Sequence, residues 1–373
     1  MEKEITEKQS GVNPTKVVYL FGAGATQAEI SLRDDTIRLL MKDIRDGMLS
    51  KIDKEKIKEL QYVKNELADE NSDVEHLLTL YESTGISEHD TIAKKLKELF
   101  MREIQERVGK LGKEYTPRLL SALIDMHNVP ALNEELKGII TLNYEELLER
   151  AFQDVKGGIN YSISMNCLHD HLTFGKDVEP ILKLYGSFNW KNEFPISLTD
   201  EDKIKRPEEV LWIPPGVEKR RERYPFSILW GRAREILDCD ILRVIGCSLN
   251  RNDWQLIALL YTTQKLTAHK KVYLIELIDY HDKGVEVRDS YTYLSFRLIS
   301  DIKEIRDSLK KSYFKEIKEE GKLSKAIESL LSNPKINIFD TWLRAKGEYL
   351  KDNNIAISTK GRFFENYINE VSL

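Results

Sequence analysis

The chain has 373 residues, of which 41% are hydrophobic and 32% charged, and its formal net charge is −5 at pH 7. This length fits one large domain or two to three smaller ones, with ample apolar residues for a core. The mild negative charge argues against direct, bulk electrostatic binding of nucleic acid. No stretch approaches the roughly 18 apolar residues of a membrane span, and the charged N-terminus lacks a signal-peptide core. We therefore expect a cytoplasmic protein without membrane contact.

The first predicted element is a strand over residues 17 to 21, an apolar run typical of a strand buried on both faces of a parallel sheet. It leads into five residues that favour a tight turn and a helix start: Gly22, Ala23, Gly24, Ala25 and Thr26. Glycines let backbone N–H groups approach a ligand closely, and a helix start attracts anions. The pattern predicts a diphosphate site. A turn that binds nothing is the alternative, because Gln27 replaces the third glycine of G-x-G-x-x-G.

Residues 27 to 135 have a largely helical pattern, which predicts a helical insertion. Ser72 can cap one of these helices, and Glu75 can complete a capping box. We interpret Asp73 and Glu75 first as capping residues and second as ligand contacts. The heavily charged segment 91 to 110 is expected to form a solvent-exposed helix with ion pairs along its surface.

Further apolar runs predict strands at residues 138–142, 181–184, 210–213, 240–245 and 272–275. Because they alternate with helices, they predict an α/β fold with a mainly parallel sheet. Ligands bind such sheets at the carboxyl ends of strands, where the strand order reverses. Three motifs stand at predicted strand ends: Thr141-Leu142-Asn143-Tyr144-Glu145, Leu184-Tyr185-Gly186 and Gly246-Cys247-Ser248-Leu249.

Together with the turn at Gly22, these motifs resemble, in order, the sirtuin-like NAD-binding family, and more closely its bacterial antiphage-defence members than the protein deacetylases. The resemblance covers roughly residues 15 to 280. It implies a Rossmann-like parallel sheet flanked by helices. Residues 281 to 373 have a charged, mostly helical pattern, which predicts a C-terminal helical region that serves in core packing or in assembly. Apolar positions there include Ile327, Leu330 and Leu331.

The resemblance also implies roles for individual residues. Gly22, Ala23, Gly24 and Ala25 would contact the diphosphate of NAD through their backbone, and Thr26 would add a hydroxyl. Asn143 would hold the nicotinamide ribose and orient the attacking water, with helix capping as its alternative role. Gly246 and Ser248 would meet the adenosine ribose and phosphate. Glu276 would accept bonds from the adenine ribose, unless it is an ordinary carboxylate at a strand end.

Tyr185 departs from the family pattern, which has histidine in Leu-His-Gly. An imidazole accepts a proton near neutral pH, whereas a phenol with a reference pKa of about 10 does not do so readily. General-base assistance is worth about 10²–10⁴-fold in rate. Either the protein uses Tyr185 naturally at the catalytic position or the residue marks an inactivating exchange. His169 and His171, just upstream, could substitute.

Two functions follow from the resemblance. The first is an NAD+ hydrolase that releases nicotinamide and ADP-ribose as the effector of a bacterial antiphage defence system. The second is a non-catalytic NAD- or ADP-ribose-binding regulatory or assembly subunit of a defence complex. For either we expect a homo-oligomer with a separate partner such as a HerA-type ATPase, because the chain has no P-loop.

A third possible function is that of a deacylase or an ADP-ribosyltransferase, and the cysteine content bears on the deacylase. The chain has three cysteines, Cys167, Cys239 and Cys247, and none forms a C-x-x-C pair. A four-cysteine zinc ribbon of the kind carried by protein-deacetylating sirtuins cannot be built from three. We therefore expect NAD as a substrate, no metal, and no peptide deacetylation.

Overall fold

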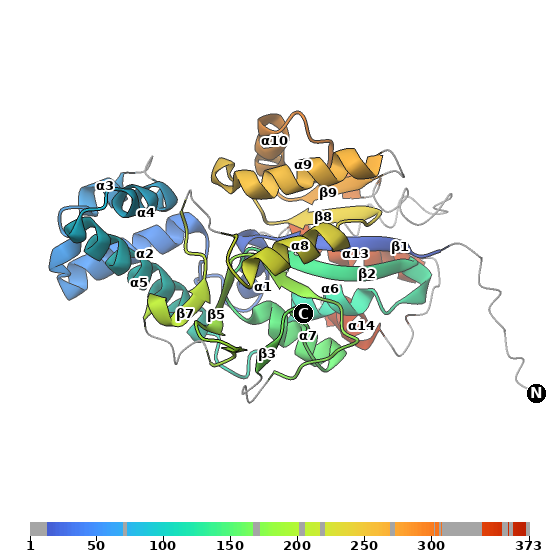
Figure 1. Cartoon of the computed structure of the whole chain (residues 1–373). Coiled ribbons are helices and arrows are strands. Elements are labelled where there is room, and N and C mark those ends of the chain that lie inside the picture. Colours follow the sequence, from blue (N-terminus) through green and yellow to red (C-terminus); the bar gives the residue numbers. More distant parts are fainter. Residues whose placement is uncertain are drawn as a thin grey trace, which may run out of the picture.

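The computed structural model of the protein describes residues 13–69, 73–166, 172–200, 206–216, 221–268, 273–301, 303–305, 307, 338–352, 357 and 361–370. A six-stranded parallel sheet lies at its centre, in the order β10-β9-β8-β1-β2-β4 (Figure 1). The strands are β1 (Thr15–Phe21), β2 (Glu134–Thr141), β4 (Ile181–Lys183), β8 (Ile241–Ile245), β9 (Leu274–Ile278) and β10 (Phe296–Ile299). The predicted α/β fold is therefore confirmed.

The central strand β1 explains why this sheet forms. Val17 to Leu20 have no exposed surface and Phe21 has 2%, as expected for an apolar strand with neighbours on both edges and helices on both faces. Within the sheet, Tyr19 lies opposite Ile139 on one side and Arg243 on the other. That register brings the carboxyl ends of β1, β2 and β8 to the same edge.

The strand order fixes where a ligand site can form. From β1 the chain builds outward through β2 and β4, then returns to β1 and builds through β8, β9 and β10 in the opposite direction. This is the 3-2-1-4-5-6 order of a Rossmann-like doubly wound sheet, whose ligands bind where the order reverses. Here the reversal lies between β1 and β8.

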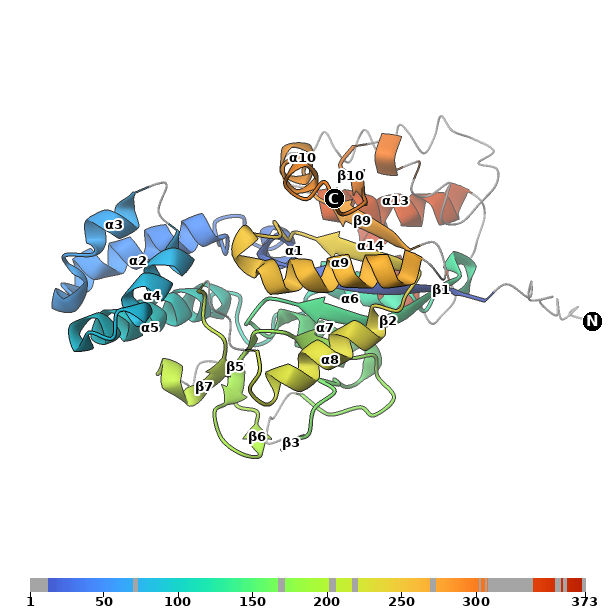
Figure 2. The ribbon, with the colours of Figure 1, turned by 45° about the horizontal axis from the view of Figure 1, so that its top comes forward.

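Helices cover both faces of the sheet (Figure 2). One face carries α8 (Phe226–Ile236) and α9 (Trp254–Ala268), with α10 (His281–Ser290) against β10. The other carries α1 (Ala23–Ser31), α6 (Arg118–Met126), α7 (Leu147–Lys156), α13 (Ile338–Asp352) and α14 (Arg362–Asn369). No described helix is both long enough and apolar enough to cross a bilayer.

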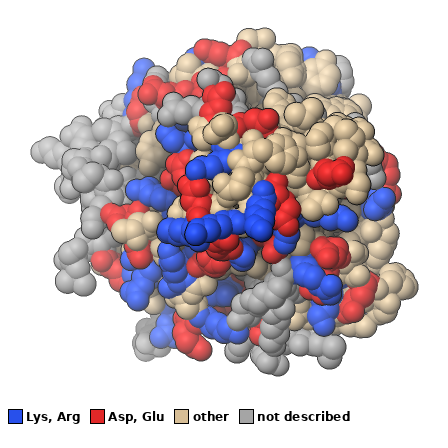
Figure 3. Space-filling model, turned by 90° about the vertical axis from the view of Figure 1, so that its left-hand side faces the viewer, with Lys and Arg blue, Asp and Glu red and all other residues tan. Residues whose placement is uncertain are grey.

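A helical lobe projects beside the sheet between α1 and α6 (Figure 1). It consists of α2 (Met41–Glu55), η1 (Lys58–Leu60), α3 (Lys64–Ala68), α4 (Val74–Ser83) and α5 (Ser87–Gly109). Figure 3, which faces this side, shows acidic and basic side chains intermixed rather than gathered by sign. Ion pairs such as Lys51–Glu106 belong to this surface. Its helix α4 is capped by Asp73, which accepts a bond from the Glu75 N–H at 2.8 Å, whereas Ser72 lies outside the described residues.

Two small two-stranded sheets are formed by segments between α7 and α8. β5 (Gly186–Lys191) pairs antiparallel with β7 (Val210–Trp212), and β3 (Met165–Asn166) pairs with β6 (Ile196–Ser197). The predicted strand at 210–213 therefore forms outside the main sheet. Short 3-10 turns, η2 (Pro130–Leu132), η4 (Pro207–Glu209) and η5 (Arg251–Asp253), complete the described elements.

The C-terminal region is part of the sheet domain. β10 is an edge strand of the sheet. Helix α13 buries the side chains of Phe339 and Trp342, and the Phe339 ring lies 6.2 Å from the ring of Phe21 in β1. Helix α14 packs against α6. The apolar positions expected at Ile327, Leu330 and Leu331 lie outside the described residues.

Candidate functional site

The turn after β1 is pressed against the end of β8. The Gly22 N–H donates to the Ile245 carbonyl at 3.1 Å, and the Gly24 N–H donates to the Gly246 carbonyl at 2.9 Å. A Cβ on Gly24 would lie 2.7 Å from the Gly246 Cα, and Gly246 itself has φ +58°. These glycines are therefore required for backbone packing at the strand-order reversal. Ala23, the first residue of α1, is exposed there and faces solvent.

Asn143 lies directly beside that turn, at the carboxyl end of β2. Its side-chain Nδ2 donates to Thr26 Oγ1 at 2.8 Å and to the Gly22 carbonyl at 3.1 Å. Both amide hydrogens are thus used within the protein, and no donor among the described residues reaches Oδ1. The amide is held with its acceptor oxygen available to a ligand. It does not cap α7, which begins at Leu147 with Glu146 at its N-cap.

Glu145 is the third member of the hydrogen-bond network that includes Asn143 and Thr26. Thr26 Oγ1 donates to Glu145 Oε1 at 2.5 Å, so the hydroxyl that accepts from Asn143 is itself oriented by a buried carboxylate. Burial raises the pKa of Glu145. The Lys183 charge and the hydrogen bond from Thr26 lower it, but by less than burial raises it. Lys183 Nζ donates to the Glu145 carbonyl at 2.6 Å and to Glu149 Oε1 at 2.7 Å. The network therefore holds the start of α7 against both α1 and β4.

Tyr185 follows β4 and has a different partner. Its hydroxyl donates to Asp253 Oδ1 at 2.7 Å, and the side chain is 4% exposed. Burial raises the pKa of Tyr185 well above its usual value, and the Asp253 carboxylate raises it further. The phenol is consequently a hydrogen-bond donor fixed on Asp253, and it has no proton-accepting role near neutral pH.

The loop after β8 connects the sheet to the helical lobe. Asn252 Nδ2 donates to Asp73 Oδ2 at 2.8 Å and to Glu75 Oε2 at 2.9 Å. Asp73 therefore caps α4, and the carboxylates of Asp73 and Glu75 together anchor the β8–α9 loop. Ser248, predicted to meet a phosphate, is exposed on the same loop. Its neighbour Leu249 has φ +46°, and its carbonyl accepts a bond from Tyr291.

Glu276 does not join this edge. The prediction that it ends its strand is wrong, because β9 continues to Ile278 and the side chain has no exposed surface. Its carboxylate accepts a bond from Arg243 Nε at 2.9 Å inside the sheet domain. Arg243 also bonds Glu134, with Lys346 of α13 3.5 Å from Glu134. Glu276 thus belongs to a buried charge cluster with Arg243, Glu134 and Lys346. Two further side chains adjoin the cluster: Arg297, 3.4 Å from Glu276, and His127, whose Nδ1 lies 3.9 Å from Glu134.

Sequence reasoning found the turn, Asn143 and Tyr185 but missed three contributors. Glu145 was noted only as part of a motif, because burial of a carboxylate is invisible without tertiary structure. Asp253, in the turn before α9, accepts the hydrogen bond of Tyr185, a contact between residues 68 positions apart. Asn252 had no local signal, since its partners are 179 and 177 positions away. His169, His171 and Cys167 lie outside the described residues.

Comparison with known proteins does not assign the chain to a family. No protein-family model matches the chain, and no curated protein matches it in sequence. The functional argument therefore depends on the motifs and on the geometry of the sheet edge.

Proposed function

We propose that the chain binds NAD+ across the reversal between β1 and β8 and hydrolyses it to nicotinamide and ADP-ribose. The observation that supports this most is Asn143. Its amide is fixed at 2.8 Å and 3.1 Å by Thr26 and Gly22, beside a glycine turn and a helix start. Dinucleotides bind such sheets at this point, with the diphosphate at the helix N-terminus.

The chemistry requires breaking the bond between nicotinamide and ribose through an oxocarbenium-like state. In this proposal the first turn of α1 receives the diphosphate, and Asn143 Oδ1 accepts a hydrogen bond from the ribose hydroxyl or from the attacking water. Thr26 and Glu145 act behind Asn143 by fixing its orientation. Glycoside cleavage of this kind needs positioning before it needs strong acid or base catalysis.

Tyr185 gives specific support to the second candidate, a non-catalytic NAD- or ADP-ribose-binding subunit. Its hydroxyl is committed to Asp253 and its pKa is raised, so no general base stands at this position. We infer that hydrolysis by this chain is slow. We further propose that the protein is a homo-oligomeric component of antiphage defence and works with a HerA-type ATPase, which follows from the motif resemblance alone.

Nicotinamide release and NAD+ binding, measured side by side, test the proposal. We expect Asn143→Ala to abolish release while costing about 1–3 kcal/mol of stability, because the change removes the donor to Thr26 and to the Gly22 carbonyl. We expect Tyr185→His to raise the rate, because Asp253 would orient the imidazole, by up to about 10²–10⁴-fold.

Tyr185→Phe is the matched control, since it removes the same hydroxyl and adds no base. A rise in rate with Phe equal to that with His would show that the base argument is incorrect. Absence of NAD+ and ADP-ribose binding by the unchanged protein would reject both candidate functions.

A further inference from the structure

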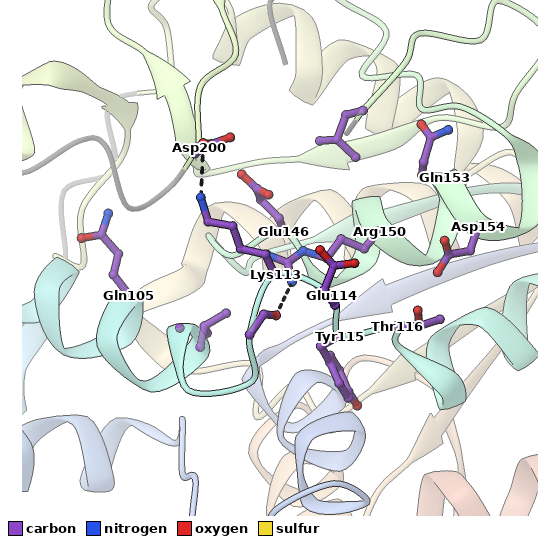
Figure 4. Close-up of a pocket in the computed structure, with 14 residues that line it drawn as sticks. Gln105, Lys113, Glu114, Tyr115, Thr116, Glu146, Arg150, Gln153, Asp154 and Asp200 are labelled. Carbon is purple, nitrogen blue, oxygen red and sulfur yellow. Dashed lines mark hydrogen bonds and ion pairs between the residues drawn. The ribbon is translucent and has the colours of Figure 1, made fainter. Parts of the chain in front are cut away.

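A cavity lies away from the strand-order reversal. It has a volume of about 350 Å³ and is enclosed by the end of α5, the loop at residues 112–116 and the outer side of α7 (Figure 4). Cavities of this size take small ligands. None of the residues predicted from the motifs lines it, so it is separate from the proposed NAD+ site.

The α7 wall carries charges of alternating sign. Glu146, Arg150 and Asp154 follow one another at four-residue spacing, which places them on one face of the helix and about 6 Å apart along its axis. All three line the cavity, as Figure 4 shows. The wall therefore presents an anion, a cation and an anion in a row.

The remaining walls limit what can enter. Lys113 approaches Asp200, with its Nζ 3.4 Å from Asp200 Oδ2 (Figure 4). Arg150 Nη1 donates to the Gly112 carbonyl at 3.3 Å, which holds its guanidinium toward the loop. Leu172 is buried and supplies an apolar surface. Together the charged side chains number four carboxylates and two cations: Glu114, Glu146, Asp154, Asp200, Lys113 and Arg150.

We propose that this cavity binds a small molecule that carries one carboxylate and two cationic groups, of the class of the basic amino acids. The ligand carboxylate pairs with Arg150, whose planar guanidinium suits a carboxylate. Its two ammonium or guanidinium groups pair with Glu146 and Asp154, and its aliphatic stem lies against Leu172. The net negative lining favours a ligand with one positive charge over a neutral zwitterion.

The cavity walls belong to elements that also form the proposed NAD+ site. Glu146 is adjacent in the chain to Glu145, and Tyr115 donates from its hydroxyl to Glu29 Oε1 of α1 at 2.5 Å. A ligand that joins α7 to the loop at 112–116 would add contacts present only in the folded protein. It should therefore raise the unfolding midpoint as well as bind.

Isothermal titration with the full chain tests this inference without NAD+. L-Arginine and L-lysine are the ligands, and norleucine, which keeps the stem but lacks the terminal cation, is the matched control. We expect saturable 1:1 binding of a basic amino acid and at least about tenfold weaker binding of norleucine, the effect of losing one charge-assisted bond. Failure of both basic amino acids to saturate at about 1 mM, or equal binding of norleucine, would overturn the proposal.

Substitutions then locate the binding. Arg150→Gln and Asp154→Asn should each weaken binding about tenfold or more, and Asp154 is exposed enough that its change leaves the fold intact. The controls are Arg232→Gln and Glu235→Gln, which break an exposed pair on α8 at 2.6 Å outside the cavity. Loss of binding in the control variants, or its persistence in Asp154→Asn, would place the ligand elsewhere.

Discussion

At the scale of single residues, Ala23 offers a cleaner test of diphosphate binding than the glycines do. A side chain on Gly24 would collide with the Gly246 backbone, so loss of ligand binding by such a variant would report a damaged fold. Ala23 is exposed, it opens α1, and the first turn of that helix holds no acidic residue. A charge can be introduced there without disturbing the contact between the turn and β8.

We predict that Ala23→Glu weakens NAD+ binding at least about tenfold while leaving stability unchanged or raised by about 0.3–1 kcal/mol. A carboxylate at a helix N-terminus interacts favourably with the helix dipole, yet it repels a diphosphate placed there. Ala23→Gln, of similar size and without charge, is the control. Titration of both variants with ADP-ribose measures the effect. Unchanged affinity in Ala23→Glu would show that the diphosphate does not bind at the start of α1.

At the scale of secondary-structure elements, the sequence predicts the centre of the sheet better than its surroundings. β1 and the end of β2 are recognisable because continuous apolar runs stop at glycine or asparagine. Glu276 was assigned to a strand end because the charge interrupts an apolar run, but Arg243 neutralises it inside the sheet and the strand continues. The pairing of β5 with β7 and the position of α13 depend on long-range packing that local patterns do not encode.

The junction between α4 and the β8–α9 loop leads to a second prediction. Asn252→Ala removes both bonds to Asp73 and Glu75 and leaves two part-buried carboxylates without that donor. We expect a loss of about 1–3 kcal/mol in stability and faster amide hydrogen exchange in α4 than in α5. Asn250→Ala, which removes only a local turn bond on the same loop, is the control. Equal exchange in the two variants would show that Asn252 does not hold the lobe.

At the scale of the whole molecule, the buried charge cluster makes stability depend on pH. Burial lowers the pKa of His127 to about 3, and Arg243 holds the pKa of Glu134 at about 2 against its burial. In both cases the unfolded chain takes up protons at pH values where the folded chain does not. The contribution of these two groups to stability is therefore fully present above their unfolded pKa values and is lost as the pH drops from about 6.5 toward 3.

We predict a slope of about 1.4 kcal/mol per pH unit for each group that titrates in its window, His127 between about pH 6.5 and 3 and Glu134 between about 4.5 and 2. Denaturant unfolding at pH 7, 6 and 5 measures the first of these. His127→Gln keeps a hydrogen-bonding group beside Tyr19 but cannot take up the proton, so its stability should change less over this range. An identical pH slope in the variant would assign the effect to other groups.

The same molecule-wide connections decide the order in which a growing chain can complete its fold. The Lys16 N–H donates to Asp240, 224 positions later, and the Phe364 N–H donates to Asp125, 239 positions earlier. At about 5–20 residues per second, a ribosome needs roughly 10 to 45 s to supply the partner of Lys16. During that interval the edge of β1 that pairs with β8 has no partner strand, and the Gly22 N–H lacks the Ile245 carbonyl to which it donates. The segment that is synthesised first is thus among the last to reach its final neighbours, and it depends on the nascent chain staying free of aggregation until α13 and α14 arrive.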